Sequence, residues 1–185
     1  RLLSPFGEAV SERAAETLRE HDVDLHRSTE VDALVGEERV EAVEVDGERH
    51  PADVAVVGIG IEPNTALVAD SGITFGPSGA IAVDDYGRTN LDNVYAAGDC
   101  AEMRNAVTGE PDWVPLGLTA NRAGRAIGQT VAGDPAPVGD IVGTAVVKAF
   151  ELECGRSGVL DHGRAREAGF DPVSETITAG PRAGN

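Results

Sequence analysis

The amino-acid sequence predicts an α/β fold, and three observations lead to that prediction. Short apolar runs at residues 54–57 and 94–97 each end at a glycine, as strands buried on both faces of a parallel sheet do. Residues 7–20 and 117–132 carry helical patterns of small and apolar side chains. Glycine accounts for 23 of the 185 residues, which suits tight turns between strands and helices.

The composition indicates a packed and strongly acidic protein. Hydrophobic residues make up 41% and charged residues 25%, so a globular core is expected. The formal net charge is −17 and Lys148 is the only lysine, which argues against nucleic-acid binding. We interpret this acidic surface as halophilic, with high salt screening the self-repulsion. The sequence has neither a long apolar run nor a leader, so we expect a cytoplasmic protein with no membrane partner.

The first segment, residues 1–60, has the pattern of the end of an α/β unit. A helix is expected over residues 7–20, where Val10, Ala14 and Leu18 share one face. A short strand follows at Val23 and Leu25, which alternate with polar residues.

Two more elements complete that first segment. Residues 38–50 predict a hairpin, because Asp46-Gly47 is a strong signal for a two-residue turn. The apolar run at 54–57 then predicts a strand buried in a parallel sheet.

The second segment, residues 61–137, predicts strands at 81–83 and 94–97 and a helix from Gly117 to about residue 132. Three small residues spaced four apart give this helix a smooth face that could pack on a sheet or a flat ring. They are Ala120, Gly124 and Gly128.

The third segment, residues 138–185, predicts a strand at 144–150 and a weak helix near 163–168. Its last residues, 179–185, are expected to be a disordered tail.

Gly98 and Asp99, which follow the apolar run at 94–97, are the most informative pair. A glycine here lets the backbone approach a ligand, and the carboxylate could accept hydrogen bonds from sugar hydroxyls at the carboxyl edge of a sheet. The alternative is an aspartate that merely caps a turn after a strand, and strand-Gly-Asp alone favours that alternative.

The flanking residues change this balance. The stretch with Arg88-Thr89, followed by residues 94–101, resembles the second flavin-binding motif of the pyridine nucleotide–disulfide oxidoreductase family. The resemblance implies that Asp99, presented after Gly98, contacts the ribityl chain of FAD. It also implies that the residues just after it, Ala101 among them, lie near the pyrophosphate.

The start of the helix at Gly117 is the second candidate site. A helix N-terminus concentrates free N–H groups and partial positive charge, which would stabilise an anionic reduced flavin. The alternative is an ordinary amphipathic helix start. The resemblance implies that Pro115, Leu116, Gly117 and Leu118 line the flavin, although related NADH oxidases and coenzyme A-disulfide reductases usually carry threonine at the position of Leu118.

The third candidate is the stretch at residues 56–64. It is a weak dinucleotide fingerprint, because Pro63 stands where G-x-G-x-x-G requires glycine. It resembles instead the family's crossing from the NAD domain back to the FAD domain. That likeness places Gly60 near the nicotinamide of NAD(P)H, and Asn64 could cap a short helix after it.

The order of the three segments also matches the family. It implies the end of an NAD(P)-binding domain at 1–60, the C-terminal part of an FAD-binding domain at 61–137, both Rossmann-like, and the start of an α+β dimerisation domain at 138–185. A homodimer is therefore expected of the full-length enzyme. The likeness covers about residues 1–170 and is greatest to NADH oxidases, NADH peroxidases and coenzyme A-disulfide reductases.

No residue of this chain is predicted to be catalytic or to bind a metal. Cys100 and Cys154 form no C-x-x-C pair, and the family's redox cysteine belongs to an N-terminal segment that is absent from this sequence. The four histidines have no metal-ligand spacing.

The implied function is hydride transfer from NAD(P)H to FAD, with electrons passing on to a small-molecule acceptor: a disulfide, oxygen or a peroxide. Both glycine fingerprints are missing and the chain opens at Arg1, so we expect part of a longer enzyme that is inactive by itself. The alternative is a non-catalytic, self-associating module that no longer binds flavin.

Overall fold

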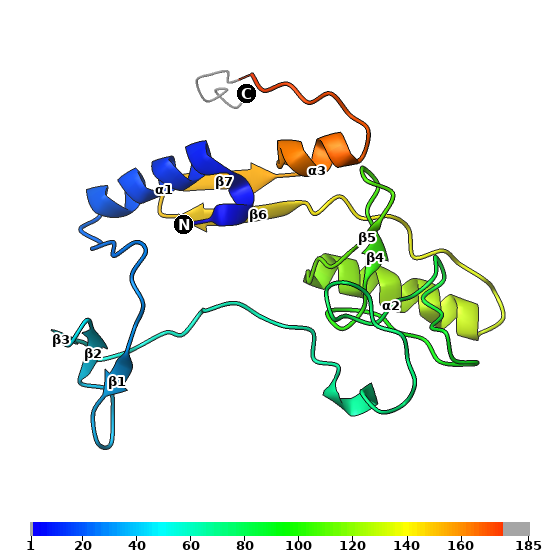
Figure 1. Cartoon of the computed structure of the whole chain (residues 1–185), viewed down its shortest axis with the longest axis horizontal. Helices are drawn as coiled ribbons and strands as arrows, with labels where there is room; N and C mark the ends of the chain where they lie inside the picture. Colours follow the sequence, from blue (N-terminus) through cyan, green and yellow to red (C-terminus); the bar gives the residue numbers. More distant parts are fainter. Residues whose placement is uncertain (1, 176–185) are drawn as a thin grey trace, which may run out of the picture.

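The computed structural model describes residues 2–175, and it contains a mixture of helices and small sheets (Figure 1). Its helical elements are η1 (Ser4–Phe6), α1 (Glu8–Glu20), η2 (Ala66–Val68), α2 (Gly117–Val131) and α3 (His162–Glu167). Its strands are β1 (Ala33–Val35), β2 (Ala42–Val45), β3 (Glu48–Pro51), β4 (Met103–Arg104), β5 (Pro111–Asp112), β6 (Ala145–Ala149) and β7 (Leu152–Arg156).

The strands of the described residues form three separate antiparallel sheets, β1-β2-β3, β4-β5 and β6-β7. The predicted hairpin is confirmed in β2 and β3, whose turn is Asp46-Gly47. Both turn residues have positive φ, 50° and 79°, as a type I′ turn requires. The predicted strand at 144–150 is confirmed as β6, whereas its partner β7 was not predicted.

All three predicted helices are confirmed as α1, α2 and α3, within one or two residues at each end. Their small and apolar residues recur at helical spacing, which tertiary packing then uses. In α1 the buried positions are all small: Ser11, Ala14, Ala15 and Thr17. Small side chains let α1 lie close along the β6-β7 hairpin (Figure 1).

The end of α1 contacts the turn of that hairpin through one aromatic pair. The rings of His21 and Phe150 stack with centroids 3.7 Å apart. His21 also lies 3.4 Å from a carboxylate oxygen of Glu151. The first and third segments of the sequence are thus in direct contact.

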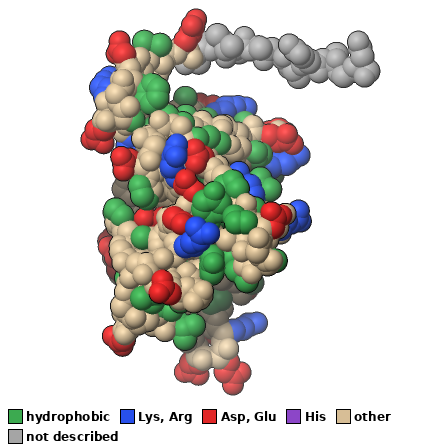
Figure 2. Space-filling model, turned by 90° about the vertical axis from the view of Figure 1, so that its right-hand side faces the viewer, with side chains coloured by type: hydrophobic (Ala, Val, Ile, Leu, Met, Phe, Trp, Pro, Cys, Tyr) green, Lys and Arg blue, Asp and Glu red, His purple; other side chains and the backbone are tan. Residues whose placement is uncertain are grey.

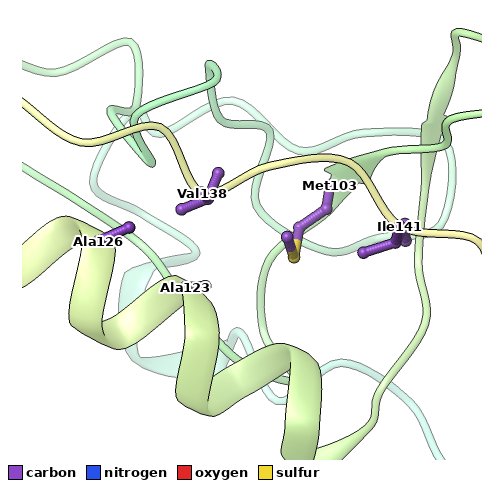
Figure 3. Packing of buried hydrophobic residues seen from close by; sticks show 5 residues of the cluster. All are labelled: Met103, Ala123, Ala126, Val138 and Ile141. Carbon is purple, nitrogen blue, oxygen red and sulfur yellow. The ribbon is translucent and has the colours of Figure 1, made fainter.

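Two apolar clusters form the core of the middle of the chain. One joins α2 to β4 and to the segment after α2, through Met103, Ala123, Ala126, Val138 and Ile141 (Figure 3). The other joins the loops on both sides of the Gly-Asp pair, through Ile73, Ile81, Ala96 and Ala101. These two clusters position the candidate site described below.

Four strand predictions are wrong. Residues 23–25, 54–57, 81–83 and 94–97 form no strand in the structure. Residue 81 makes only isolated bridges, to Phe75 and Ala101, and Tyr95 makes one to Arg88. A buried parallel strand needs a hydrogen-bonded neighbour on each side, and among the described residues the run at 54–57 has none. The runs at 81–83 and 94–97 have hydrogen-bonded neighbours, but the pairing does not extend beyond these isolated bridges.

The run at 54–57 departs most from its prediction. It lies in an extended connector, residues 52–65, which has neither helix nor strand and crosses open space between the β1-β2-β3 sheet and the rest of the molecule (Figure 1). Val56 and Ile59 are each 93% exposed. Apolar side chains at such spacing are expected to be covered, so the connector lacks its packing partner within the described residues.

The surface matches the acidic composition. Acidic side chains are scattered among apolar and basic ones over the face shown in Figure 2. Within residues 2–175, no helix has both the length and the apolar character that crossing a membrane requires. The tail predicted at 179–185 lies outside the described residues.

Candidate functional site

The Gly98-Asp99 pair forms a turn between the two apolar clusters. Ala96 and Ala101 are buried in one cluster, and Ala97 packs against the other. The turn itself is closed by the N–H of Ala101, which donates to the carbonyl of Gly98 over 3.1 Å. Packing on both sides therefore fixes the backbone that carries Asp99.

Gly98 brings this turn against the first turn of α2. Its φ is +85°, a conformation that glycine adopts without a steric cost. A Cβ added at Gly98 would lie 3.6 Å from the Cβ of Ala120, in the first turn of α2. The structure thus brings together the two candidate sites that the sequence predicted separately, the Gly-Asp pair and the start of the helix.

The start of α2 is open. Leu116 is its N-cap, with an extended backbone, and no side chain caps the helix. Pro115 and Leu116 are half-buried, whereas Gly117 is exposed and Leu118 is 85% exposed. Backbone N–H groups at an uncapped start carry partial positive charge and are suited to an anionic or hydrogen-bond-accepting group.

Asp99 is exposed, and its carboxylate accepts no hydrogen bond from the residues that the structure describes. An aspartate that capped a turn would accept one from a backbone N–H, so the turn-cap alternative has no support here. An exposed carboxylate beside a helix start fits a ligand with hydroxyl groups, such as the ribityl chain of a flavin.

Ala101 and Gly60 lie in different surroundings from the other residues predicted to bind a cofactor. The side chain of Ala101 is 5% exposed and packs in the core, so only its backbone could approach a ligand. Gly60 has a φ of +110° and lies in the exposed connector. A Cβ added at Gly60 would have no atoms within 4 Å. The structure does not bring Gly60 into contact with the Gly-Asp turn.

The Arg88-Thr89 pair serves the local structure of the same region. The hydroxyl of Thr89 donates to the carbonyl of Val94 over 3.0 Å, which closes the loop before the apolar run. The guanidinium of Arg88 lies 3.6 Å from a carboxylate oxygen of Asp84 and over the ring of Tyr86. This pair therefore shapes the approach to the Gly-Asp turn.

Of the smooth face predicted on α2, only Ala120 lies near another part of the chain that the structure describes, beside Gly98. The buried positions are Ala123, Ala126 and Thr130. Gly124 and Gly128 are exposed, and added Cβ atoms there would meet nothing within 4 Å. The glycine face is thus free of contacts among the described residues.

Two smaller expectations have clear outcomes. The cap predicted at Asn64 is wrong, because η2 begins after Thr65 and has no side-chain cap. Cys100 is half-buried, its thiol 3.4 Å from the carbonyl of Ala97, and Cys154 is buried. Within residues 2–175, no cluster of three metal-ligating side chains occurs.

Sequence reasoning missed two residues beside the turn. The indole N–H of Trp113 donates to the main-chain carbonyl of Asp99 over 2.8 Å. Glu102 is buried, and its carboxylate accepts hydrogen bonds from the backbone and hydroxyl of Ser78. The sequence did offer one signal for Trp113: it is the only tryptophan, and it lies two residues before Pro115.

Comparison with known proteins identifies the class. Residues 1–123 match the pyridine nucleotide-disulphide oxidoreductase family, and the chain belongs to that family. Among curated relatives, an NAD(P)H sulfur oxidoreductase (CoA-dependent) of Pyrococcus furiosus is 34% identical over 179 residues, 96% of this chain and 40% of the relative. Other relatives are named NADH oxidase and coenzyme A disulfide reductase, the enzymes that the sequence resemblance predicted.

Solved structures agree with this assignment. An NAD-dependent persulfide reductase from A. fulgidus superposes with a TM-score of 0.81 at 36% identity, covering 92% of this chain and 32% of that one. An FAD-dependent pyridine nucleotide-disulphide oxidoreductase from Desulfovibrio vulgaris gives a TM-score of 0.78 at 37% identity, covering 87% of this chain and 41% of that one. The names of these enzymes include NAD and FAD, the two cofactors predicted from the sequence.

The chain spans about 40% of the length of the curated relative from Pyrococcus furiosus. The superposition on the A. fulgidus protein covers 92% of this chain but only 32% of that one.

Proposed function

We propose that this chain is the C-terminal portion of a flavoprotein oxidoreductase that passes hydride from NAD(P)H to FAD and then electrons to a disulfide, oxygen or a peroxide. The observation that carries the proposal is the closeness of Gly98 to Ala120, which places the Gly-Asp turn beside the uncapped start of α2. Family membership and the names of the relatives support the same reaction class.

The residues of this chain would bind and orient the flavin. Asp99 offers an unpartnered carboxylate for the ribityl hydroxyls, and Gly98 lets the backbone approach closely. The N–H groups at Gly117 and Leu118 would face the pyrimidine edge, where negative charge develops on reduction. Pro115 and Leu116, both half-buried, would shape the apolar wall beside the ring.

FAD, when bound, supplies the two-electron chemistry, accepting hydride from NAD(P)H and returning electrons to the second substrate. Gly60 would lie near the nicotinamide once the connector is packed, because a glycine permits close approach there. The acceptor stays open between a disulfide, oxygen and a peroxide. Proteins named NAD(P)H sulfur oxidoreductase and NADH oxidase both occur among the relatives.

We also propose the division of the chain implied by its sequence. Residues 1–60 would end an NAD(P)-binding domain, 61–137 would return to an FAD-binding domain, and 138–185 would begin a dimerisation domain of a homodimer. The break in structure at the connector supports the first boundary, and β6 begins soon after the second.

The test is FAD affinity in the complete flavoprotein that contains this chain. Asp99→Ala removes a charge-assisted hydrogen bond worth about 1.5–3 kcal/mol, so FAD should bind roughly 10- to 100-fold more weakly. Asp92→Ala is the matched control, since Asp92 is an exposed carboxylate of the same stretch. The dissociation constant is measured by loss of flavin fluorescence on binding.

Three results are informative. A yellow protein that bleaches with NADH, and loses affinity only in Asp99→Ala, supports the proposal. Equal affinity in both variants removes Asp99 from the site. A complete protein that stays colourless with added FAD, yet dimerises, would leave the non-catalytic module as the better description. Oxygen, peroxide and disulfide are then compared as oxidants of the reduced flavin.

A further inference from the structure

Trp113 makes the one side-chain hydrogen bond to the Gly-Asp turn among the described residues. Its indole N–H donates to the main-chain carbonyl of Asp99 at 2.8 Å. The bond acts on the backbone of Asp99 and leaves the carboxylate free. It therefore restricts the peptide that orients the carboxylate without competing with a ligand for it.

Trp113 is itself held by the residue before it. The backbone N–H of Trp113 donates to one carboxylate oxygen of Asp112, at 3.1 Å. The other oxygen of Asp112 accepts from the side-chain amide of Asn105 at 2.9 Å and from the guanidinium of Arg164 at 3.1 Å. Both oxygens of Asp112 are thus occupied.

The Asn105 end of this network is rigid. Asn105 is 3% exposed, and its side-chain oxygen accepts from the backbone N–H groups of Val107 and Thr108. A buried amide with its oxygen and nitrogen both engaged has one favourable orientation. Asp112 is therefore anchored from the core side of the network.

The Arg164 end comes from a different part of the sequence. Arg164 lies in α3, 52 residues beyond Asp112, within the segment proposed to begin the dimerisation domain. Its side chain is 52% exposed and that of Asp112 is 21% exposed, so solvent weakens this pair. The arginine contributes less to the position of Trp113 than the buried Asn105 does.

We propose that Trp113 is a positioning residue for the flavin, which orients Asp99 through its main-chain carbonyl, and that the Arg164–Asp112 pair links this device to the third segment of the chain. This inference rests on the proposed function, because it assigns Trp113 a role at that same site. Trp113 touches no reacting atom in this scheme and acts only through Asp99.

The experiment uses Trp113→Phe in the complete flavoprotein, with FAD as the probe. Phenylalanine keeps an aromatic ring and removes the N–H donor. Loss of one neutral hydrogen bond is expected to weaken FAD binding about 5- to 10-fold. Visible circular dichroism of the bound flavin should also change, because the ribityl chain is held differently.

A double variant separates positioning from general stability. Since Trp113 acts through Asp99, adding Trp113→Phe to Asp99→Ala should weaken FAD binding by less than about 2-fold further. Arg164→Gln should weaken FAD binding about 2- to 3-fold, reflecting an exposed pair. Arg166→Gln, on the same helix and without a partner among the described residues, is the matched control and should leave affinity unchanged.

The possible results distinguish failure of the proposed function from failure of the inference about Trp113. A wild-type protein that fails to bind FAD overturns the proposed function. A wild type that binds FAD, with Trp113→Phe of equal affinity and equal dichroism, overturns this inference alone. Fully additive losses in the double variant also overturn it. Should Trp113→Phe not fold, the comparison of Arg164→Gln with Arg166→Gln decides, and equal affinities reject the link.

Discussion

Gly98 and Gly87 have similar φ angles but very different surroundings. Both have φ in the left-handed region, at +85° and +73°. A Cβ at Gly98 would make an ordinary contact, whereas one at Gly87 would overlap the side chain of Ile127. Gly87 thus lets the loop before the Gly-Asp turn sit against α2, which helps to place the candidate site.

Gly87→Ala should therefore destabilise the protein. The substitution adds backbone strain of about 1 kcal/mol and an overlap that typically costs about 1–3 kcal/mol. Gly109→Ala is the matched control, because Gly109 has φ +76° with no atoms near the added Cβ. Urea unfolding of the two variants measures the difference, and equal losses of stability would show that Ile127 moves aside freely.

Some local features of the structure were predictable from single residues, and others were not. The Asp46-Gly47 turn was predictable because both residues tolerate positive φ, a property of the residues themselves. The cap at Asn64 was not, because Thr65 precedes η2 instead and the register of a one-turn helix depends on its surroundings.

At the scale of elements, α2 has one face in contact with the core and one without contacts. Ala123, Ala126 and Thr130 are buried, while Gly124 and Gly128 meet nothing. A helix-interior glycine costs up to about 1 kcal/mol relative to alanine. Two exposed glycines in one helix are explained if their face is covered in the complete protein.

The substitutions Gly124→Ala and Gly128→Ala test this explanation. In the chain studied alone they should each raise the free energy of unfolding by up to about 1 kcal/mol. In the complete flavoprotein they should instead weaken FAD retention, because added methyl groups would crowd the covered face. Thermal unfolding and flavin release measure the two effects. The same gain in both contexts would count against a covered face.

The helix α3 depends on a single cap. The carboxylate of Asp161 accepts the backbone N–H of Arg164 at 2.8 Å, and this hydrogen bond lowers the pKa of Asp161 below its usual 3.8. A lowered folded-state pKa means that the stabilisation is complete above pH 3.8 and is lost as the pH falls through the lower, folded value. α3 should therefore fray only in acid.

The expected result is faster hydrogen exchange of the Arg164 amide as the pH falls below about 3.8, after correction for intrinsic rates. In Asp161→Asn the amide oxygen still accepts the same bond but does not titrate, so the acid-dependent loss should disappear. If Asp161→Asn kept the same acid dependence, the faster exchange of the Arg164 amide would come from a titrating group other than Asp161. The six-residue length of α3 makes it sensitive to its cap.

At the scale of the whole molecule, charge is the dominant property. A net charge of −17 on 185 residues gives a self-repulsion that the eight arginine and lysine ion pairs among the described residues only partly offset. Those pairs are largely exposed, and exposed pairs contribute little. Repulsion between exposed charges is screened within about 10 Å at 0.1 M salt and within about 3 Å at 1 M salt.

Stability should therefore rise with salt. The midpoint of thermal unfolding is expected to increase between 0.1 M and 2 M potassium chloride, most steeply in the lower half of the range, where screening changes fastest. An equal midpoint across that range would refute the halophilic interpretation. Sucrose at matched water activity is the control for effects of solute that do not involve charge.

The connector shows why part of the fold could not be predicted from this chain alone. The run at 54–57 has the composition of a buried parallel strand, yet its valines are exposed. A strand of this kind forms only when neighbouring strands bind its backbone, and residues 2–175 supply no such neighbour for this run.

Local chemistry in the sequence determined the three helices, the hairpin at Asp46-Gly47 and the family motif around Asp99, because each depends on residues close together in the chain. Only the tertiary structure decided what the Gly-Asp turn touches. Its contacts with Ala120 and Trp113 span 22 and 14 residues, and which distant side chains meet depends on how the two apolar clusters pack, a cooperative property that no short stretch encodes.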